Sequence, residues 1–221
     1  SFLQKKSIPL ESVMSKVWNN KIFKHIQTNV DKASKKLAEE RGSCPDAEEY
    51  GFKERFSNKT AIAPTASISI ICGGASPGVE PIAANSYTHK TLSGSYNVRN
   101  RYLKELLEKK GKNNNEIWSS ITTNHGSVAH LDFLNEHEKT VFKTAFELDQ
   151  KWIIELGADR TTYVSQAQSI NIFLPADVHK KELHQIHFQA WKKGLKSLYY
   201  CRSKSIQRAE NINNGSSTDV E

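Results

Sequence analysis

A short run of small and hydroxyl-bearing residues marks a place where this chain could bind an anion. The run spans residues 61–69, and at its centre stand Pro64, Thr65, Ala66, Ser67 and Ile68. Small side chains let a bound group approach the backbone, and hydroxyl and amide donors near the start of a helix suit phosphate. A glycine-rich turn, residues 73–78, follows closely. The pattern therefore indicates a site for a phosphate-bearing ligand.

Two adjacent tyrosines, Tyr199 and Tyr200, are the second feature with chemical potential. They lie in a short strand-like run, residues 195–202, far along the chain from the first motif. A phenol carries a proton that can leave together with an electron, so phenols in contact can relay both. A phosphate cradle and a tyrosine pair together suggest an enzyme that acts on nucleotides and moves electrons.

Neither motif decides the function by itself, and ordinary structural interpretations stay open. Small residues are common at strand ends, and tyrosine favours strands, where consecutive side chains point to opposite faces. Gly73 and Gly78 have the glycine spacing of a P-loop, but Val79 and Glu80 follow where that motif needs Lys and Ser or Thr. No G-x-G-x-x-G follows the predicted strand, so a dinucleotide fingerprint is excluded as well.

The histidines and cysteines form neither a metal-binding nor a disulfide pattern. His184 and His187 are three residues apart on a predicted helix, but no further ligands complete a site, so no metal is predicted. Cys44, Cys72 and Cys201 are widely spaced and odd in number. This argues against a disulfide framework and indicates a reducing, cytoplasmic environment.

Composition excludes some classes of protein. A chain of 221 residues, 37% of them hydrophobic, is long enough to bury a core. No run approaches the roughly 18 apolar residues of a membrane span, and no signal-peptide pattern is present, so no membrane association is expected. The formal net charge is +7. Because the lysines are scattered over predicted helices without interleaved aromatic residues, they favour solvated helix faces over nucleic-acid binding.

Apolar periodicity and capping signals predict helices over residues 9–41, 96–110, 135–156 and 177–194, with Asp177 as the last N-cap. Gly42, Gly111 and Gly157 are the predicted ends of the first three. Strands are predicted over residues 59–71, 169–175 and 195–201, and a loop over 73–94. This order indicates an α/β architecture with parallel strands, in which residues 169–202 form a strand–helix–strand crossover. Residues 1–202 are assigned to one domain and residues 203–221 to a mobile polar tail.

Several motifs occur in a specific order along the chain. They are the run at residues 61–69, residues 78–81 (Gly-Val-Glu-Pro), residues 159–163 (Asp-Arg-Thr-Thr-Tyr), residues 166–175, and residues 196–203 with the tyrosine pair. Each is weak alone, but in this order they resemble the large (alpha) subunit of class I ribonucleoside-diphosphate reductase. The resemblance reaches to about residue 210 and concerns only the C-terminal part of that subunit.

The resemblance implies a fold and a role for both motifs. The fold would be the C-terminal portion of a ten-stranded α/β barrel, helix-rich, of the kind shared with glycyl-radical enzymes. The loop from Pro64 to Ile68 would hold the substrate diphosphate through the N–H groups of residues 65–68 and the hydroxyls of Thr65 and Ser67. Tyr199 and Tyr200 would end a radical-transfer path toward a cysteine that abstracts the 3′-hydrogen. A firmly held diphosphate fixes the sugar relative to that radical.

The resemblance also implies a reaction and partners. The reaction would reduce ribonucleoside diphosphates to 2′-deoxyribonucleoside diphosphates for DNA replication. Expected partners are the substrate, the rest of the large subunit, a second large subunit in a dimer, and a small (beta) subunit whose metal centre supplies the radical. No cofactor would bind this chain directly, and thioredoxin or glutaredoxin would supply electrons. The helix at residues 177–194 resembles the surface that receives the C-terminal peptide of the small subunit, although its apolar stripe could instead pack on the barrel.

Parts of the family pattern have no counterpart in this sequence. They are the three catalytic cysteines, the cysteine pair of the C-terminal tail and the N-terminal, allosteric ATP-binding domain. Cys44, Cys72 and Cys201 lie outside the matched catalytic positions and receive no role. The chain is therefore expected to be inactive alone, as a fragment or as one piece of a split subunit. Two alternatives stay open: a fragment of a cobalamin-dependent reductase, which does not need the tyrosine pair, and a basic module that binds nucleic acid.

Overall fold

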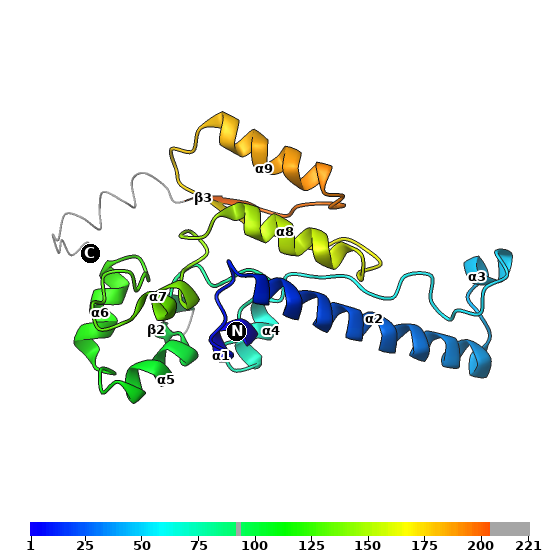
Figure 1. The fold of residues 1–221 in the computed structure, drawn as a ribbon. Helices are drawn as coiled ribbons and strands as arrows, with labels where there is room; N and C mark the ends of the chain where they lie inside the picture. The colour runs from blue at the N-terminus through cyan, green and yellow to red at the C-terminus, as the bar shows by residue number, and fades with distance from the viewer. Residues whose placement is uncertain (92–93, 204–221) are drawn as a thin grey trace.

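The computed structural model describes residues 1–91 and 94–203, and helices are the main secondary structure among them (Figure 1). The helices are α1 (Phe2–Lys5), α2 (Val13–Arg41), α3 (Pro45–Glu49), α4 (Ala66–Ile71), α5 (Arg101–Lys109), α6 (Asn115–Thr123), α7 (Glu136–Val141), α8 (Gln150–Thr161) and α9 (Lys180–Lys192). The strands are β1 (Ser86–Thr91), β2 (Gly94–Arg99), β3 (Ile172–Leu174) and β4 (Cys201–Ser203). β1 pairs with β2 antiparallel, and β3 pairs with β4 parallel.

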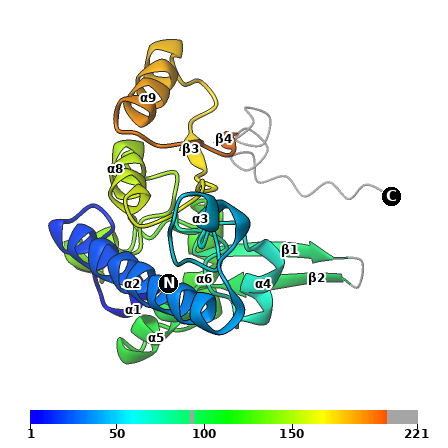
Figure 2. The ribbon, with the colours of Figure 1, turned by 90° about the vertical axis from the view of Figure 1, so that its right-hand side faces the viewer.

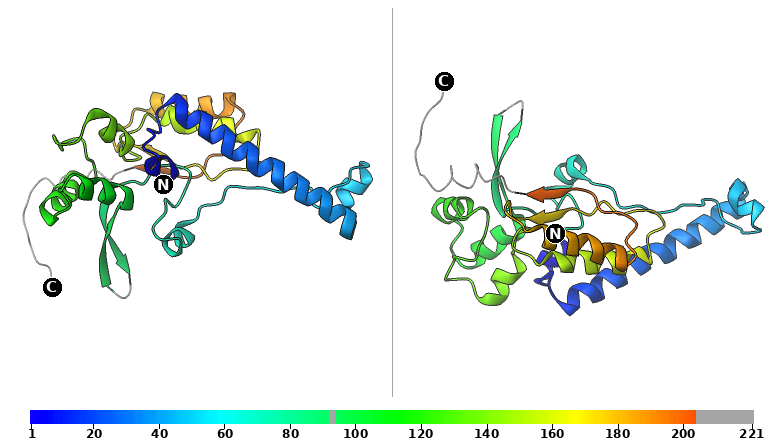
Figure 3. Two further views of the ribbon diagram at one scale, coloured as in Figure 1. Left: turned by 60° about the horizontal axis from the view of Figure 1, so that its bottom comes forward. Right: turned by 90° about the horizontal axis from the view of Figure 1, so that it is seen from above.

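The long first helix is bounded by local signals that the sequence carries. Ser12 is the N-cap of α2, and its hydroxyl oxygen accepts a hydrogen bond from the Ser15 N–H at 3.2 Å. Gly42 ends the helix with φ +81°, a conformation that favours glycine. The helix predicted over residues 9–41 is therefore confirmed, with a start at Val13 rather than Pro9. Its C-terminal half and α3 extend away from the other helices (Figure 3).

The predicted strand–helix–strand crossover is confirmed. Ile172 lies opposite Cys201 in the parallel β3–β4 pair, and α9 connects the two strands. Figure 2 shows α8 and α9 on the same side of this pair. The apolar cluster between them includes Ile153, Ile154, Ile170, Ile172, Ile186 and Ala190.

Two details of the crossover differ from the prediction. His179, not Asp177, is the N-cap of α9, because its ring nitrogen accepts a hydrogen bond from the Lys181 N–H at 3.1 Å. The last strand begins at Cys201 rather than at residue 195, so both tyrosines precede it. The predicted mobile tail, residues 203–221, lies outside the described residues except for Ser203, which belongs to β4.

The single helix predicted over residues 135–156 is wrong, because the chain forms α7 and α8 with a turn between them. In that turn the Glu147 carboxylate accepts a hydrogen bond from the Thr144 N–H at 2.8 Å, and the Ala145 N–H donates to the Ile82 carbonyl at 3.0 Å. These bonds divert the amides that would continue a helix. α8 then runs through Gly157, the predicted end, where an added Cβ would lie 2.7 Å from Ile170 Cδ1.

Three further predictions are wrong in whole or in part. The strand expected over residues 59–71 is reduced to one bridge between Ile62 and Gln168, and α4 begins at Ala66. The loop expected over residues 73–94 contains β1, and the helix expected over 96–110 is confirmed only as α5, which follows β2 and has Asn100 as its N-cap. Helix α6 was not predicted. The β1–β2 hairpin extends from the helices around it (Figure 3, in green).

A buried asparagine fastens the base of this hairpin. Asn85 is 1% exposed, and its side-chain amide donates to the carbonyls of Gly126 at 2.9 Å and Phe142 at 2.7 Å. Its side-chain oxygen accepts a hydrogen bond from Asn100 Nδ2 at 2.7 Å. Every polar atom of this amide thus has a partner, which a buried amide needs. Asn85 therefore joins β1 to the segments that contain α5, α6 and α7.

Replacing Gly126 by Ala is expected to destabilise this junction strongly. Gly126 has φ +81°, and an added Cβ would lie 2.3 Å from Ala84 Cβ and 2.8 Å from the Asn85 backbone nitrogen. Steric strain in a packed site and a left-handed alanine together should lower stability by about 3 kcal/mol. Thermal unfolding of the chain measures this. Gly111→Ala is the matched control, since its φ is +66° with nothing within 4 Å, and should cost only about 1 kcal/mol.

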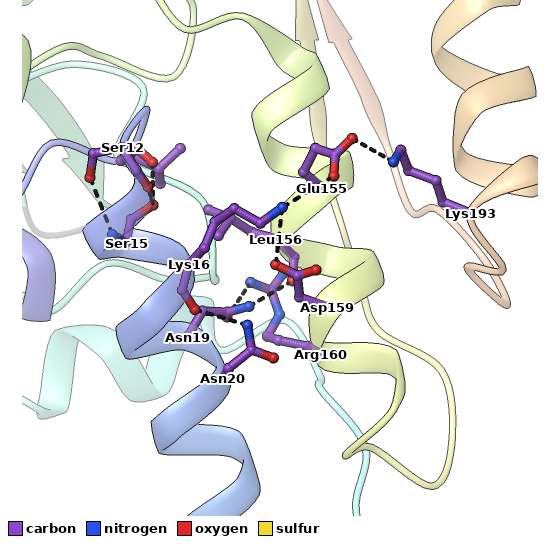
Figure 4. Close-up of polar contacts among 11 residues, drawn as sticks. Ser12, Ser15, Lys16, Asn19, Asn20, Glu155, Leu156, Asp159, Arg160 and Lys193 are labelled. Atoms are coloured by element: carbon purple, nitrogen blue, oxygen red, sulfur yellow. Dashed lines mark hydrogen bonds and ion pairs between the residues drawn. The ribbon is translucent and has the colours of Figure 1, made fainter.

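A polar network connects α2, α8 and α9 (Figure 4). Glu155 on α8 pairs with Lys193 after α9 at 2.6 Å and with Lys16 on α2 at 3.4 Å. Asn19 on α2 donates to the Leu156 carbonyl at 3.0 Å and accepts a hydrogen bond from Arg160 Nη1 at 3.1 Å. These contacts lie along the α2–α8 interface and fix its register.

The stability contributed by Glu155 should depend on pH. The hydrogen bond from Lys193 lowers the pKa of the Glu155 carboxyl below its ordinary 4.5, although burial acts in the opposite direction. A depressed carboxyl pKa stabilises the fold above pH 4.5, and this contribution is lost as pH falls through the folded-state value. Glu155→Gln should therefore lower stability by about 1 kcal/mol at neutral pH and by less in acid. Urea unfolding at both pH values measures this, and Glu105→Gln, at an exposed position on α5, is the control. An equal loss for Glu155→Gln at both pH values would contradict it.

No helix within residues 1–91 and 94–203 combines the length and the apolar character that a membrane crossing requires.

Candidate functional site

One cavity brings together the two motifs that the sequence singled out. Its volume is about 510 Å³. Pro64 and Ala66 of the first motif line it, and Tyr199 of the second lines it too. The remaining lining residues come from the segment at 77–84, from Tyr87, and from the β3 and β4 region: Asn171, Phe173 and Arg202. Segments more than 130 residues apart in the sequence thus meet in one place.

The first motif forms the start of a short helix rather than a strand. Thr65 is the N-cap residue of α4, and both its N–H and its hydroxyl donate to the Pro77 carbonyl, at 3.0 and 2.9 Å. Among the described residues, the N–H groups of Ala66, Ser67 and Ile68 have no acceptor. Unpaired amides at a helix start are suited to an anion. The predicted donors at residues 66–68 are therefore open, whereas the protein itself occupies those of Thr65.

The Gly-Val-Glu-Pro turn is hydrogen-bonded to Asn171, the residue that precedes β3. Glu80 is 6% exposed, and its carboxylate accepts hydrogen bonds from the Asn171 N–H and, at 3.4 Å, from Asn171 Nδ2. At Gly78 an added Cβ would lie 2.2 Å from Glu80 Oε2, so a side chain there would displace the Glu80 carboxylate from Asn171. The turn holds the Pro77 carbonyl to which Thr65 donates, and so positions the start of α4.

The two tyrosines are held in contact by the backbone that precedes β4. The Tyr199 N–H donates to the Ile170 carbonyl at 2.8 Å, and the Ile172 N–H donates to the Tyr200 carbonyl at 2.9 Å. Their ring centroids are 4.1 Å apart, with the planes tilted by 55°. A hydrogen bond with the Tyr200 phenol is the main cause that raises the pKa of Tyr199. Tyr199 lines the cavity, and both rings are about half exposed.

Arg202 is a site residue that no sequence pattern had singled out. Its guanidinium lies 5.2 Å from the centroid of the Tyr200 ring, and its Nε donates to Asn171 Oδ1 at 3.3 Å. The spacing to Tyr200 could have indicated this contact. Residues two apart in an extended chain lie on the same face, and Arg202 is two residues after Tyr200. Asn171 and Glu80 stood in the motifs that were recognised, but nothing local marked them as partners.

The cysteines and histidines do not contribute to this cavity. Cys72 and Cys201 are exposed, Cys44 is partly buried, and all three are free thiols. None of them lines the cavity. In the described part of the chain, no group of three or more histidine, cysteine, aspartate or glutamate side chains is arranged to hold a metal ion.

Comparison with known proteins assigns the chain to a family. Residues 46–201 match the family described as "Ribonucleotide reductase, barrel domain". The chain belongs to this family. It is 50% identical to the ribonucleoside-diphosphate reductase large subunit of Invertebrate iridescent virus 6. The alignment spans 216 residues and covers 96% of this chain and 22% of that protein. It is 31% identical to the large subunit of Danio rerio, over 89% of this chain and 28% of that protein.

The solved structures give the same assignment. The structure titled "Actinobacillus ureae class Id ribonucleotide reductase alpha subunit" superimposes with a TM-score of 0.85 and 38% sequence identity, covering 97% of this chain and 38% of that chain. The expected fold class, a C-terminal portion of the reductase α/β barrel, is therefore confirmed. This reductase barrel segment spans between about a seventh and two fifths of the proteins it matches. The similarity supports neither the cobalamin-dependent nor the nucleic-acid-binding alternative.

Arg160, within the motif at residues 159–163, is buried, with 4% of its surface exposed. Its Nε donates to Gln168 Oε1 at 3.0 Å, beside the bridge that Gln168 forms with Ile62. Burial lowers the pKa of Arg160 to about 10, and the nearby Glu80 and Asp159 oppose this change, so the guanidinium stays charged at neutral pH. Arg160 therefore connects Asn19 on α2, through Gln168, to the segment around Ile62 that precedes the first motif.

Proposed function

We propose that this chain forms the C-terminal part of the catalytic barrel of a class I ribonucleoside-diphosphate reductase large subunit. The complete enzyme would reduce ribonucleoside diphosphates to 2′-deoxyribonucleoside diphosphates by thiyl-radical chemistry. The observation that carries the proposal is the shared cavity, which Ala66 from the first motif and Tyr199 from the second both line. A radical reaction on a nucleotide needs an anchor for the phosphates and a route for the radical close together.

The anchor would be the loop from Pro64 to Ile68. The open N–H groups of Ala66, Ser67 and Ile68 support this role, together with the exposed Ser67 hydroxyl. Backbone amides do not titrate, so such an anchor would work throughout the physiological pH range. Thr65 would act mainly by holding the loop, through its two hydrogen bonds to the Pro77 carbonyl.

The route would be the tyrosine pair. The contact between the rings and the position of Tyr199 on the cavity support a relay that runs from Tyr200 through Tyr199 toward the substrate. The thiyl radical would form on a cysteine of the preceding part of the subunit. Cys44, Cys72 and Cys201 have no part in the proposed reaction.

The proposed reaction requires partners. A small subunit with a metal centre would supply the radical, the large subunits would pair as a dimer, and thioredoxin or glutaredoxin would return electrons. Such a dithiol system works in a reducing compartment, so we place the enzyme in the cytoplasm. On α9, the exposed Phe188 and Trp191 rings lie 5.6 Å apart and offer an aromatic surface for the C-terminal peptide of the small subunit.

Reconstitution tests the proposal. The complete large subunit that contains this sequence is combined with its small subunit, a dithiol reductant and a ribonucleoside diphosphate, and deoxynucleotide is measured. Product should form only when both subunits are present, and the 221-residue chain alone should give none. Product formed with cobalamin in place of the small subunit, or no product from any ribonucleoside diphosphate, would overturn the proposal.

A further inference from the structure

Arg202 connects the tyrosine pair to the loop that carries the first motif. Its guanidinium lies over the Tyr200 ring at 5.2 Å, and its Nε donates to Asn171 Oδ1 at 3.3 Å. Asn171 in turn donates to the Glu80 carboxylate through both its backbone and its side-chain nitrogen. Arg202 is opposite Phe173 in the β3–β4 pair, and Asn171 lies two residues before Phe173. A cation on an aromatic face and a hydrogen bond to a fixed amide together restrict the arginine more than either contact alone.

We propose that Arg202 is a positioning residue for the radical relay, which holds the Tyr200 ring against Tyr199 and ties it, through Asn171 and Glu80, to the substrate loop. This inference rests on the proposed function and names a residue to which that function assigned nothing. The tie is continuous: Glu80 closes the turn at Gly78, and Pro77 in the same turn accepts both hydrogen bonds of Thr65. The relay and the phosphate anchor therefore share one rigid support.

The charge of Arg202 has a second consequence for the relay. In the relay step the Tyr200 phenoxyl radical takes one electron and one proton from Tyr199. Tyr200–O• and Tyr199–OH thus give Tyr200–OH and Tyr199–O•, and the reverse transfer returns the radical to Tyr200 after turnover. A guanidinium over the ring disfavours any intermediate in which the ring keeps the proton and turns positive. Arg202 also acts to lower the pKa of Tyr199, against the larger effect of the hydrogen bond with Tyr200. The first effect disfavours loss of the electron ahead of the proton, and the second makes the Tyr199 proton easier to remove.

The first test compares arginine variants in the complete large subunit with its small subunit. Arg202→Gln should lower kcat at least about tenfold with the KM for ribonucleoside diphosphate changed less than about twofold, because ring placement and not substrate contact is lost. Arg202→Lys, which keeps the charge, should recover part of the rate. The matched control is Arg99→Gln, since Arg99 also covers an aromatic ring, Trp118 at 5.1 Å, and donates to an asparagine oxygen, Asn115 at 3.1 Å. This variant should behave as wild type.

A second measurement does not depend on turnover. With 3-fluorotyrosine incorporated at position 199, fluorine NMR follows the ionisation of that phenol in the complete subunit. Arg202→Gln should raise its pKa, Arg202→Lys should raise it less, and Arg99→Gln should leave it unchanged. If wild type reduces ribonucleoside diphosphates but Arg202→Gln matches Arg99→Gln in kcat and in this pKa, the inference is overturned. If wild type itself is inactive with its small subunit, the proposed function fails, and the pKa series still decides whether Arg202 acts on the tyrosine pair.

Discussion

Tyr200→Phe in the complete large subunit is expected to abolish turnover while leaving the fold and nucleotide binding intact. Phenylalanine keeps the ring whose centroid lies 4.1 Å from that of Tyr199 but has no phenolic proton to transfer. Loss of a positioned proton transfer lowers rates by on the order of 10²–10⁴-fold. Tyr199→Phe should have the same effect, because a relay fails when either member is missing. Deoxynucleotide formation gives kcat, and equilibrium binding of a ribonucleoside diphosphate gives affinity.

The control for both variants is a tyrosine of similar chemistry outside the cavity. Tyr50, which follows α3 at the far end of α2, is 71% exposed and lines no part of the cavity. Tyr50→Phe should therefore be fully active. Near-normal activity of either Tyr199→Phe or Tyr200→Phe would remove the radical-relay assignment, even if the enzyme were otherwise a reductase.

Ser67→Asp should sharply weaken substrate binding without weakening the fold. Ser67 is in the first turn of α4, where a carboxylate stabilises a helix by about 0.3–1 kcal/mol. The same carboxylate would repel a bound diphosphate, and two charges about 4 Å apart interact by ~1 kcal/mol in water and by ~4 kcal/mol near a protein surface. The KM for ribonucleoside diphosphate should therefore rise at least about tenfold, which is about 1.4 kcal/mol.

Ser67→Asn separates charge from size in this experiment. Asparagine has nearly the shape of aspartate and no charge, so its KM should stay within a few-fold of wild type. Initial rates over a range of substrate concentrations give KM, and thermal unfolding gives stability. Equal KM values for the two variants would mean that no anionic group binds at the start of α4.

The parts of the fold that could be predicted are those encoded over short distances. The end of α2 at Gly42 and the crossover containing β3 and α9 follow from apolar periodicity and glycine conformation. Both signals depend only on residues that are close in the sequence. The break between α7 and α8 could not be predicted, because it depends on Glu147 binding the Thr144 N–H and on Ile82 binding the Ala145 N–H. Ile82 is more than 60 residues from Ala145, and the apolar periodicity of residues 135–156 gives no information about such a distant partner.

The hairpin was missed for the same reason. The segment at residues 86–99 has weak local strand signals, and its base is fixed by Asn85 through contacts to Gly126 and Phe142. Likewise, small residues after Pro64 suggested a strand end, whereas the Pro77 carbonyl binds both donors of Thr65 and lets a helix start at Ala66. In each case a distant acceptor decided which local conformation the backbone took.

The sequence by itself determined which chemical groups this protein carries and, through the order of its motifs, the family to which it belongs. The hydroxyl groups of Thr65 and Ser67 and the phenols of the tyrosine pair are properties of the residues themselves, so the sequence is enough to identify them. Only the tertiary structure decided that Ala66 and Tyr199 line one cavity and that Arg202 covers the Tyr200 ring. The physical reason is that these contacts depend on burial and on hydrogen bonds between residues far apart in the sequence, and such residues come together only in the folded chain.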